Sequence, residues 1–412
     1  MAEAQTDDVF IDDIKLQAAD GYTLAATLFL PRRAKRKQAI LINSAAAVPR
    51  KIYKGFASYL AGRGAVVLTY DYRGIGGSRP KSLKGFPATM SDWARLDATA
   101  AVNWMRTRYK EHPLDVIGHS FGGQAVGLIP NNTEIQRTLF IAALAPHWRL
   151  IASPERYRVY AMMKYLGQPL ARLLGYVPGR VGIGEDMPKD VFLQWSSWIM
   201  NPRYFFTDDL LEGRGNFEKY RGELRAFCIA DDPWGTRAAV ELLCSGFTGI
   251  EPQIIDIVPK ENDAGQIGHF GFFRPQHRKT LWRKAGDWLF DEAEVDPAPE
   301  EIANPEETTE AQVAPSSESA AKMEVAKPEA ANSEAPAAEG AATSVPGPVA
   351  ASPGAAAAKP TSEAKPADAP AIESKAQTPQ AAVDTADVER LLTRFHELKT
   401  QQPMAGSASP ST

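Results

Sequence analysis

The chain contains very little cysteine, because only Cys228 and Cys244 occur among its 412 residues. Both lie in apolar segments, where a reduced and buried thiol is the simplest interpretation. Long hydrophobic runs are also missing, since no stretch approaches the roughly 18 apolar residues of a membrane-spanning helix. Residues 1–8 are acidic and lead into no apolar core like that of a signal peptide. These absences predict a soluble cytoplasmic protein.

Aromatic residues are almost absent from the last part of the chain. Phe395 is the only Phe, Trp or Tyr after residue 292, and Ala, Pro, Glu and Ser dominate residues 293–383. This composition buries too little apolar surface to offset the entropy of ordering the chain, so we predict a disordered linker. Residues 384–402 then carry apolar residues at helical spacing, namely Val388, Leu391, Leu392, Phe395 and Leu398. They predict a short amphipathic helix, either transient or docking, within residues 385–402, on a protein partner or on the body of the chain.

Acidic charge is concentrated in the same region. Residues 293–412 contain 8 basic and 19 acidic residues, whereas residues 1–292 contain 38 basic and 31 acidic ones. The basic residues of the body are scattered, without a Lys/Arg block or a known nucleic-acid motif, so we expect no nucleic-acid partner. The glycines within residues 70–78 fail the spacing of a dinucleotide-binding turn, and no zinc or calcium motif occurs. The sequence therefore indicates neither a cofactor nor a metal.

The order of the apolar runs predicts an α/β fold. Two strand-like segments, 14–17 and 22–30, are joined by the turn dipeptide Asp20-Gly21 and would form an antiparallel edge. Short continuous apolar runs at residues 39–43 and 65–70 then indicate strands covered on both faces, and further strands are expected at residues 114–117, 138–144, 224–229 and 252–258. Helical segments alternate with these runs, which predicts a parallel sheet wrapped by helices on both faces.

Three helices can be placed from their termini. We expect Ser91 to cap a helix that ends near Tyr109, Pro233 to open another, and the folded part to finish with a helix over residues 278–290. A long aromatic-rich interruption at residues 147–220 separates two of the strands and suits a helical lid over an apolar pocket. The predicted domains are therefore a core of residues 1–146 and 221–292, with residues 147–220 as the lid.

One serine stands in a distinctive local pattern. Gly118-His119-Ser120-Phe121-Gly122 follows an apolar strand and precedes a helix-like stretch. A strand, a sharp turn and a helix around a serine form a nucleophile elbow, in which glycines allow the close approach of neighbouring chain and the hydroxyl is exposed. The pattern predicts that Ser120 is a nucleophile.

A serine hydroxyl needs a base within hydrogen-bond reach and an acid that orients the base. Of the six histidines, His269 lies in a glycine-flanked loop after the last predicted strand and is our choice of base, with His147 as the weaker candidate. The acid should follow a strand between serine and histidine, and Asp232 is favoured over Asp231. Either aspartate could instead cap the helix expected at Pro233.

The oxyanion of an acyl-transfer intermediate needs two backbone N–H donors. The first is expected from Phe121, the residue after the nucleophile. The second should come from the loop that follows the strand at residues 39–43, and Ala45 is the best candidate there.

Together these residues resemble the α/β-hydrolase superfamily, in particular its serine esterase, lipase and serine aminopeptidase-like members. The matching positions are the loop at residues 70–78, the elbow at Ser120, Asp232 before Pro233, and Gly268-His269-Phe270-Gly271-Phe272-Phe273. The insertion, with Met187-Pro188, Trp195, Trp198 and Tyr204, is similar to the lid of a bacterial group of predicted α/β hydrolases. One departure is Asn43-Ser44, which replaces a frequent His-Gly pair and leaves the identity of the oxyanion donor open.

The resemblance implies that Ser120 attacks an acyl carbon, His269 takes and returns the proton, Asp232 orients the imidazole, and water releases the acyl enzyme. We therefore expect a cofactor-free serine hydrolase that cleaves carboxylic esters or thioesters of a small, apolar acyl substrate. The alternatives are an acyltransferase or an aminopeptidase with the same triad, and a non-catalytic scaffold that binds partners through its tail.

Overall fold

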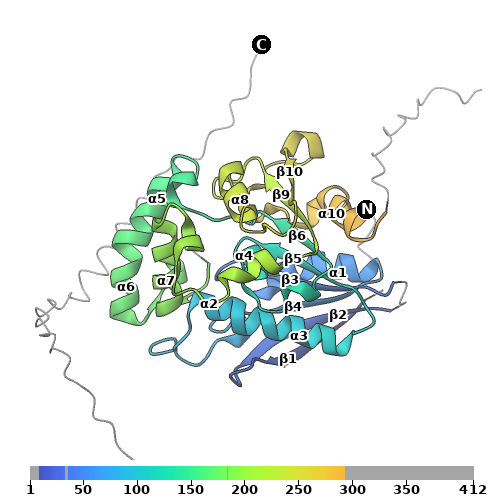
Figure 1. Cartoon of the computed structure of the whole chain (residues 1–412), viewed down its shortest axis with the longest axis horizontal. Helices are drawn as coiled ribbons and strands as arrows, with labels where there is room; N and C mark the ends of the chain where they lie inside the picture. The colour runs from blue at the N-terminus through green and yellow to red at the C-terminus, as the bar shows by residue number, and fades with distance from the viewer. Residues whose placement is uncertain (1–8, 33–35, 183, 293–412) are drawn as a thin grey trace, which may run out of the picture. The chain divides into compact units, whose positions relative to one another are not determined.

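A mostly parallel sheet forms the centre of the protein (Figure 1). The computed structural model describes residues 9–32, 36–182 and 184–292. The predictions for residues 293–383 and 384–402 lie outside these described residues. The strands of the main sheet are β1 (Val9–Gln17), β2 (Thr23–Pro31), β3 (Ala39–Asn43), β4 (Val66–Tyr70), β5 (Leu114–His119), β6 (Arg137–Ile141), β9 (Glu223–Ile229) and β10 (Gln253–Ile257).

The eight strands lie in the order β1-β2-β4-β3-β5-β6-β9-β10. β1 and β2 form the expected antiparallel hairpin, and β2 also runs antiparallel to β4. All other neighbours in this sheet are parallel. Because parallel neighbours need long crossover connections, helices separate these strands along the chain. The predicted α/β class is confirmed.

The connections contain α-helices, short 3₁₀ turns and two π-helical segments. The α-helices are α1 (Lys54–Gly62), α2 (Met90–Asp92), α3 (Thr99–Arg108), α4 (Phe121–Leu128), α5 (Glu155–Ala161), α6 (Gly167–Leu174), α7 (Lys189–Met200), α8 (Arg237–Cys244), α9 (Gly268–Gly271) and α10 (Leu281–Leu289). The π-helical segments are η3 (Trp93–Ala98) and η6 (Met162–Leu166). The 3₁₀ turns are η1 (Arg50–Tyr53), η2 (Gly76–Ser78), η4 (Asn132–Glu134), η5 (Trp148–Leu150), η7 (Gly179–Val181), η8 (Tyr204–Thr207), η9 (Arg214–Lys219), η10 (Pro259–Asn262) and η11 (Pro275–His277). No helix in the described ranges has both the length and the apolar character needed to cross a bilayer.

The sheet carries a separate hydrophobic core on each face. Successive strand residues point to opposite faces, so Ile40 and Ile42 pack with one core while Ala39 and Leu41 pack with the other. The first core, which contains Ile40 and Ile42, includes the buried sides of α1 and α10. The second core, which contains Ala39 and Leu41, includes the buried sides of α3, α4 and α8. Burial on both faces explains why the central strands read as continuous apolar runs.

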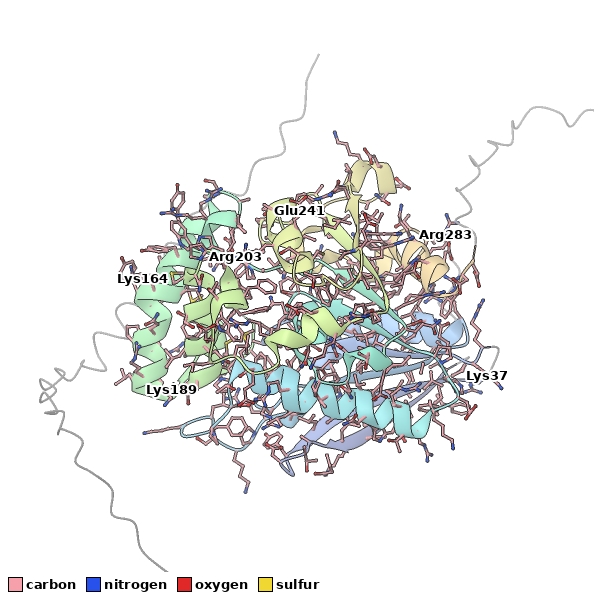
Figure 2. The ribbon with its side chains drawn as sticks, in the orientation of Figure 1. Lys37, Lys164, Lys189, Arg203, Glu241 and Arg283 are labelled. Carbon is pink, nitrogen blue, oxygen red and sulfur yellow. The ribbon has the colours of Figure 1, made fainter. Side chains whose placement is uncertain are left out.

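A large insertion between β6 and β9 contributes to the second core. It contains α5, η6 and α6 in one continuous run, followed by the two-stranded pair β7 (Tyr176–Val177) and β8 (Met187–Pro188) and then by α7. These helices lie at one side of the sheet in Figure 1. In Figure 2 the labelled Lys164 and Lys189 lie on this insertion, whereas Lys37 and Arg283 lie at the opposite side of the protein.

Two predicted helix starts are wrong. The helical segment before α3 is capped by Thr89, whose hydroxyl accepts the N–H of Asp92 while the Asp92 carboxylate accepts the N–H of Thr89. The Ser91 hydroxyl, proposed as the cap, instead accepts a hydrogen bond from Gln194 of the insertion. Likewise α8 begins at Arg237 rather than at Pro233. In the first case a tertiary contact occupies the hydroxyl that local capping rules favour.

Close approach of α4 to β3 requires glycine at residue 122. A Cβ atom built on Gly122 would lie 2.2 Å from the carbonyl oxygen of Asn43, the last residue of β3. Backbone atoms cannot yield as a flexible side chain can, so any larger residue would push the helix away from the sheet.

Gly122→Ala is therefore expected to lower the free energy of unfolding by about 3 kcal/mol, at the upper end of overpacking effects. Urea titration would measure the loss. Gly215→Ala is the matched control, because a Cβ atom there meets no atom within 4 Å, and it should leave stability unchanged. Equal stability of the two variants would contradict the packing argument.

Candidate active site

Ser120 occupies a strained turn between β5 and α4. Its backbone adopts φ 52° and ψ −116°, a conformation that residues with side chains rarely populate. A Cβ atom on Gly118 would lie 2.5 Å from the Cα of Gly123, so the chain on either side of the serine leaves room only for glycine. The hydroxyl of the half-buried Ser120 is consequently held at the carboxyl end of the sheet.

The structure brings Ser120, His269 and Asp232 together from three distant segments. His269 Nε2 lies 3.0 Å from Ser120 Oγ, and His269 Nδ1 lies 2.6 Å from Asp232 Oδ2. A carboxylate only accepts hydrogen bonds, so the imidazole carries its proton on Nδ1 and Nε2 is free to accept the serine proton. This arrangement suits proton transfer from an alcohol.

Asp232 is almost completely buried and held in one orientation. Its second oxygen, Oδ1, accepts the backbone N–H of Trp234 at 2.9 Å. Burial alone would raise the pKa of Asp232, but the adjacent His269 ring and the N–H groups of Trp234 and Gly235 favour the carboxylate more strongly and lower it overall. The carboxylate thus remains charged beside the imidazole.

Asp231, the alternative acid, binds backbone N–H groups instead of the His269 ring. Its two carboxylate oxygens accept the backbone N–H groups of Ile267 and Gly268, each at 2.9 Å. Gly268 has φ +56°, which glycine adopts without strain. Asp231 therefore fastens the segment that leads into His269, whereas its neighbour Asp232 contacts the ring.

Ala45, predicted as an oxyanion donor, is already engaged. Its N–H donates to the hydroxyl of Tyr53 at 2.8 Å, and both residues are buried. A backbone N–H provides one donor, and because this one is already bonded, the contact argues against Ala45 as the oxyanion donor. The sequence could not exclude it, because the competing Tyr53 hydroxyl comes from the following helical turn, η1.

Tyr53 and His119 form a contact that the sequence reading missed. The Tyr53 hydroxyl lies 2.8 Å from His119 Nδ1, and His119 Nε2 lies 2.8 Å from the carbonyl oxygen of His269. His119 is the last residue of β5, and its ring reaches the backbone carbonyl of His269. The sequence signal that could have indicated this contact is the position of His119 directly before the predicted nucleophile Ser120.

The side-chain amide of Asn43 holds the elbow in place. Asn43 Nδ2 donates to the carbonyl of Gly122 at 3.2 Å, while Asn43 Oδ1 accepts the hydroxyl of Tyr70 at 2.9 Å. The side chain is fully buried. It fixes the end of β3 against the first turn of α4.

The other candidate base, His147, is directed elsewhere. Its Nδ1 atom lies 3.1 Å from the carbonyl oxygen of Ile199 in α7, and the residue is buried. Burial lowers the pKa of His147 despite this hydrogen bond. His147 therefore pairs with the backbone of the insertion, whereas His269 contacts the serine.

Aromatic rings surround the His269 imidazole. The ring centroid of Trp234 lies 6.2 Å from that of His269, and Trp195 of α7 stacks on Trp234 at 6.1 Å. Phe270 meets His269 edge-on at 5.0 Å and is half exposed. The surroundings of the imidazole are thus largely apolar, which strengthens the electrostatic interactions within the site.

The insertion is hydrogen-bonded to the loop that carries Asp232. Ala152 N–H donates to the carbonyl of Pro233 at 2.8 Å, and the hydroxyl of Thr236 donates to the carbonyl of Leu150 at 2.7 Å. A third bond joins Trp234 Nε1 to the Glu155 carboxylate of α5 at 2.8 Å. These three bonds join the first part of the insertion to the acid loop.

A polar cavity of about 650 Å³ lies outside this cluster. Its lining includes Arg50, Asp71, Arg79 and Asp186, and none of the three clustered residues. Arg50 pairs with Asp71, and Arg79 pairs with Asp186, so much of the charge in the lining is neutralised. Within the described ranges no group of three or more His, Cys, Asp or Glu residues is arranged to hold a metal ion.

The model of a family described as serine aminopeptidase, S33, matches residues 34–175. The match spans β3, β4, β5 and the elbow, and the strand order and crossover helices accord with it. Over residues 34–175 the chain is therefore similar to the α/β-hydrolase superfamily, which agrees with the predicted resemblance and with the predicted sheet.

A search of curated proteins found no match to this chain. Similar solved structures include a Pyrococcus furiosus esterase, with 15% identity and a TM-score of 0.46, covering 71% of this chain and 96% of the esterase. Est1E from Butyrivibrio proteoclasticus, solved with ferulic acid, has 14% identity and a TM-score of 0.46, covering 68% of this chain and 98% of its own. A serine hydrolase without a lid from Xanthomonas campestris has 14% identity and a TM-score of 0.40, covering 68% and 94% respectively.

His119 should make stability depend on acid. Complete burial, assisted by the nearby His269, lowers the pKa of His119 from 6.5 to about 3, although the His269 carbonyl and Asp232 act in the opposite direction. The unfolded chain binds this proton first, so the contribution of neutral His119 is present above about pH 6.5 and is lost as the pH falls toward 3.

Between pH 7 and pH 4.5 the wild type should therefore lose about 2 to 3 kcal/mol more unfolding free energy than His119→Gln, which has no titrating group at this position. Urea titrations at several pH values would measure the difference. Parallel curves for the two proteins would show that His119 is not held neutral in the folded state.

Proposed function

We propose that this protein is a serine hydrolase that cleaves carboxylic esters or thioesters through an acyl-enzyme on Ser120. The observation that carries the proposal is the pair of contacts at His269, 3.0 Å to the Ser120 hydroxyl and 2.6 Å to the Asp232 carboxylate. A hydroxyl, an imidazole and a buried carboxylate in this order activate the hydroxyl as a nucleophile.

The reaction begins when His269 Nε2 accepts the proton of Ser120 as the serine oxygen bonds to the acyl carbon. Asp232 stabilises the resulting imidazolium through the hydrogen bond from Nδ1. The carbon–oxygen or carbon–sulfur bond to the leaving group then breaks, and His269 returns its proton to that group. Water attacks the acyl-enzyme by the same proton transfers and regenerates Ser120.

The negative charge that develops on the acyl oxygen requires two N–H donors. Phe121 is the first residue of α4, where N–H groups have no acceptor within their own helix. Since the Ala45 N–H donates to Tyr53, we assign the second donor to Ala46, whose N–H has no acceptor within the described part of the chain. Each such donor contributes about 100 to 1,000-fold to turnover.

The apolar surroundings of His269 favour an apolar acyl group. Trp234 and Phe270 flank the imidazole, and Trp195 extends the aromatic surface into the insertion. We propose residues 147–220 as a lid on this side of the site, with a small-molecule acyl substrate beneath it. A panel of oxygen esters and thioesters with increasing acyl length would identify the preferred substrate.

The matched family model is named for an aminopeptidase, which makes peptide hydrolysis the second candidate. Aminoacyl amides in the same panel distinguish it, because an aminopeptidase would cleave them faster than esters of the same acyl group. Transfer to an added alcohol without hydrolysis would instead indicate an acyltransferase. Failure of every acyl donor and of a fluorophosphonate probe would favour a non-catalytic scaffold.

Ser120→Ala should abolish labelling by a fluorophosphonate and reduce ester turnover by about a millionfold, because the three residues act as one unit. Ser197→Ala provides the control, since that exposed hydroxyl only donates to the carbonyl of Gln194. Gel fluorescence and an ester assay would report both variants. Unchanged labelling of Ser120→Ala would refute the assignment of the nucleophile.

Exchanging the two aspartates for asparagine should separate their roles. Asp232→Asn presents an amide to His269 Nδ1 and is expected to lower kcat about 10,000-fold, because the ring then takes the wrong tautomer. Asp231→Asn keeps one oxygen acceptor for the Ile267 and Gly268 N–H groups and should have a much smaller effect. A larger loss for Asp231→Asn would reverse the assignment of the acid.

A further inference from the structure

We propose that Tyr53 and His119 are positioning residues, which tie the oxyanion loop at Ala45 and Ala46 to the backbone of His269 through one continuous hydrogen-bond chain. The proposal rests on the proposed function, because it concerns the geometry of the groups assigned to catalysis there. Three bonds form the chain: Ala45 N to Tyr53 Oη, Tyr53 Oη to His119 Nδ1, and His119 Nε2 to the His269 carbonyl oxygen, each 2.8 Å long.

Donor and acceptor rules give this chain a single direction. The His269 carbonyl can only accept, so His119 Nε2 carries the proton. In a neutral imidazole Nδ1 must then be an acceptor, and it takes the proton of the Tyr53 hydroxyl. The remaining capacity of that hydroxyl oxygen accepts the Ala45 N–H. Each bond therefore fixes the next one.

Burial makes the chain costly to break. Neither the Tyr53 nor the His119 residue has exposed surface. The Phe273 ring packs against both, with centroid distances of 4.7 Å to Tyr53 and 4.8 Å to His119. Without water to replace a lost partner, any of the polar groups would remain unsatisfied. Burial also lowers the pKa of His119 to about 3, which agrees with the neutral ring that the geometry requires.

The chain connects segments that are far apart in the sequence. Ala45 precedes the proposed donor Ala46, and His269 bears the imidazole that contacts Ser120. His119 adjoins the nucleophile itself, so the elbow stands between the two ends of the chain. Tyr53 and His119 are fully buried, so they touch no substrate. They act by holding the oxyanion loop and the His269 backbone in position. Misplacement of reacting groups by about 1 Å can lower a rate about 100-fold.

Four variants test the chain by their rate of fluorophosphonate labelling. Tyr53→Phe and His119→Leu should slow labelling about 10 to 100-fold. His119→Gln offers one amide donor and one oxygen acceptor and should recover part of that rate. Tyr220→Phe is the matched control, because it also removes a buried hydroxyl. That hydroxyl is bonded to Thr138 and Glu223 at the opposite end of the strands, so this variant should be labelled at the wild-type rate.

Labelling of Tyr53→Phe and His119→Leu at the rate of Tyr220→Phe would overturn the proposal. Equal rates for His119→Gln and His119→Leu would also count against it, because packing alone would then explain the effect. Circular dichroism and the unfolding midpoint of each variant separate loss of fold from loss of position.

A second measurement is independent of activity. The nitrogen shifts of ¹⁵N-histidine in the wild-type chain, assigned by comparison with His119→Gln, report the tautomer of His119. The neutral form with its proton on Nε2 supports the chain, whereas a proton on Nδ1 or a charged ring refutes it. If the wild type resists fluorophosphonate, the proposed function fails, and the tautomer alone decides whether the chain exists.

Discussion

The positive φ of Ser120 is the constraint on which the site depends. A turn this sharp reverses the chain from β5 directly into α4, which forces the helix against the neighbouring strands β3 and β6. Gly118 and Gly122 permit that approach, since a Cβ on Gly122 would meet the Asn43 carbonyl at 2.2 Å. The side chain of Asn43 then bonds to the same helix through the Gly122 carbonyl. Strain at one residue is thus held by packing and hydrogen bonds on both sides.

The ring centroids of His119 and His269 lie 5.2 Å apart, yet the two rings have different surroundings. His269 lies between the serine and a buried carboxylate, and a neighbouring negative charge stabilises an imidazolium there. His119 contacts a hydroxyl and a carbonyl, neither of which carries charge. Burial among uncharged partners keeps the His119 ring neutral, whereas the proton transfer proposed for His269 would use the carboxylate beside it.

The sequence predicts the elements whose information is local. Continuous apolar runs identify the parallel strands, because strands buried on both faces cannot alternate with polar residues. The pattern around Ser120 identifies the turn, because few sequences satisfy its steric demands. The preference for Asp232 over Asp231 agrees with the contact between Asp232 and His269. The sequence does not reveal why Asp231 makes no such contact, because its carboxylate accepts the N–H groups of Ile267 and Gly268, which only the fold brings near.

Predictions fail where a distant group competes for the same atom. The Ala45 N–H is a reasonable donor by position, but the Tyr53 hydroxyl takes it, and that contact exists only after η1 packs beside β5. Ser91 fails as a cap because Gln194, over a hundred residues later, bonds to its hydroxyl. The contact of His119 with the His269 carbonyl could not be predicted, because only the fold brings these two residues, 150 positions apart in the sequence, together.

The bonds from Leu150, Ala152 and Glu155 to the acid loop have a consequence for redesign of this protein. An insertion that packs on a sheet without bonds to the site could be exchanged for another insertion as a unit. Here its first residues are hydrogen-bonded to the loop that bears Asp232, so a graft that omitted them would also disturb the position of that carboxylate.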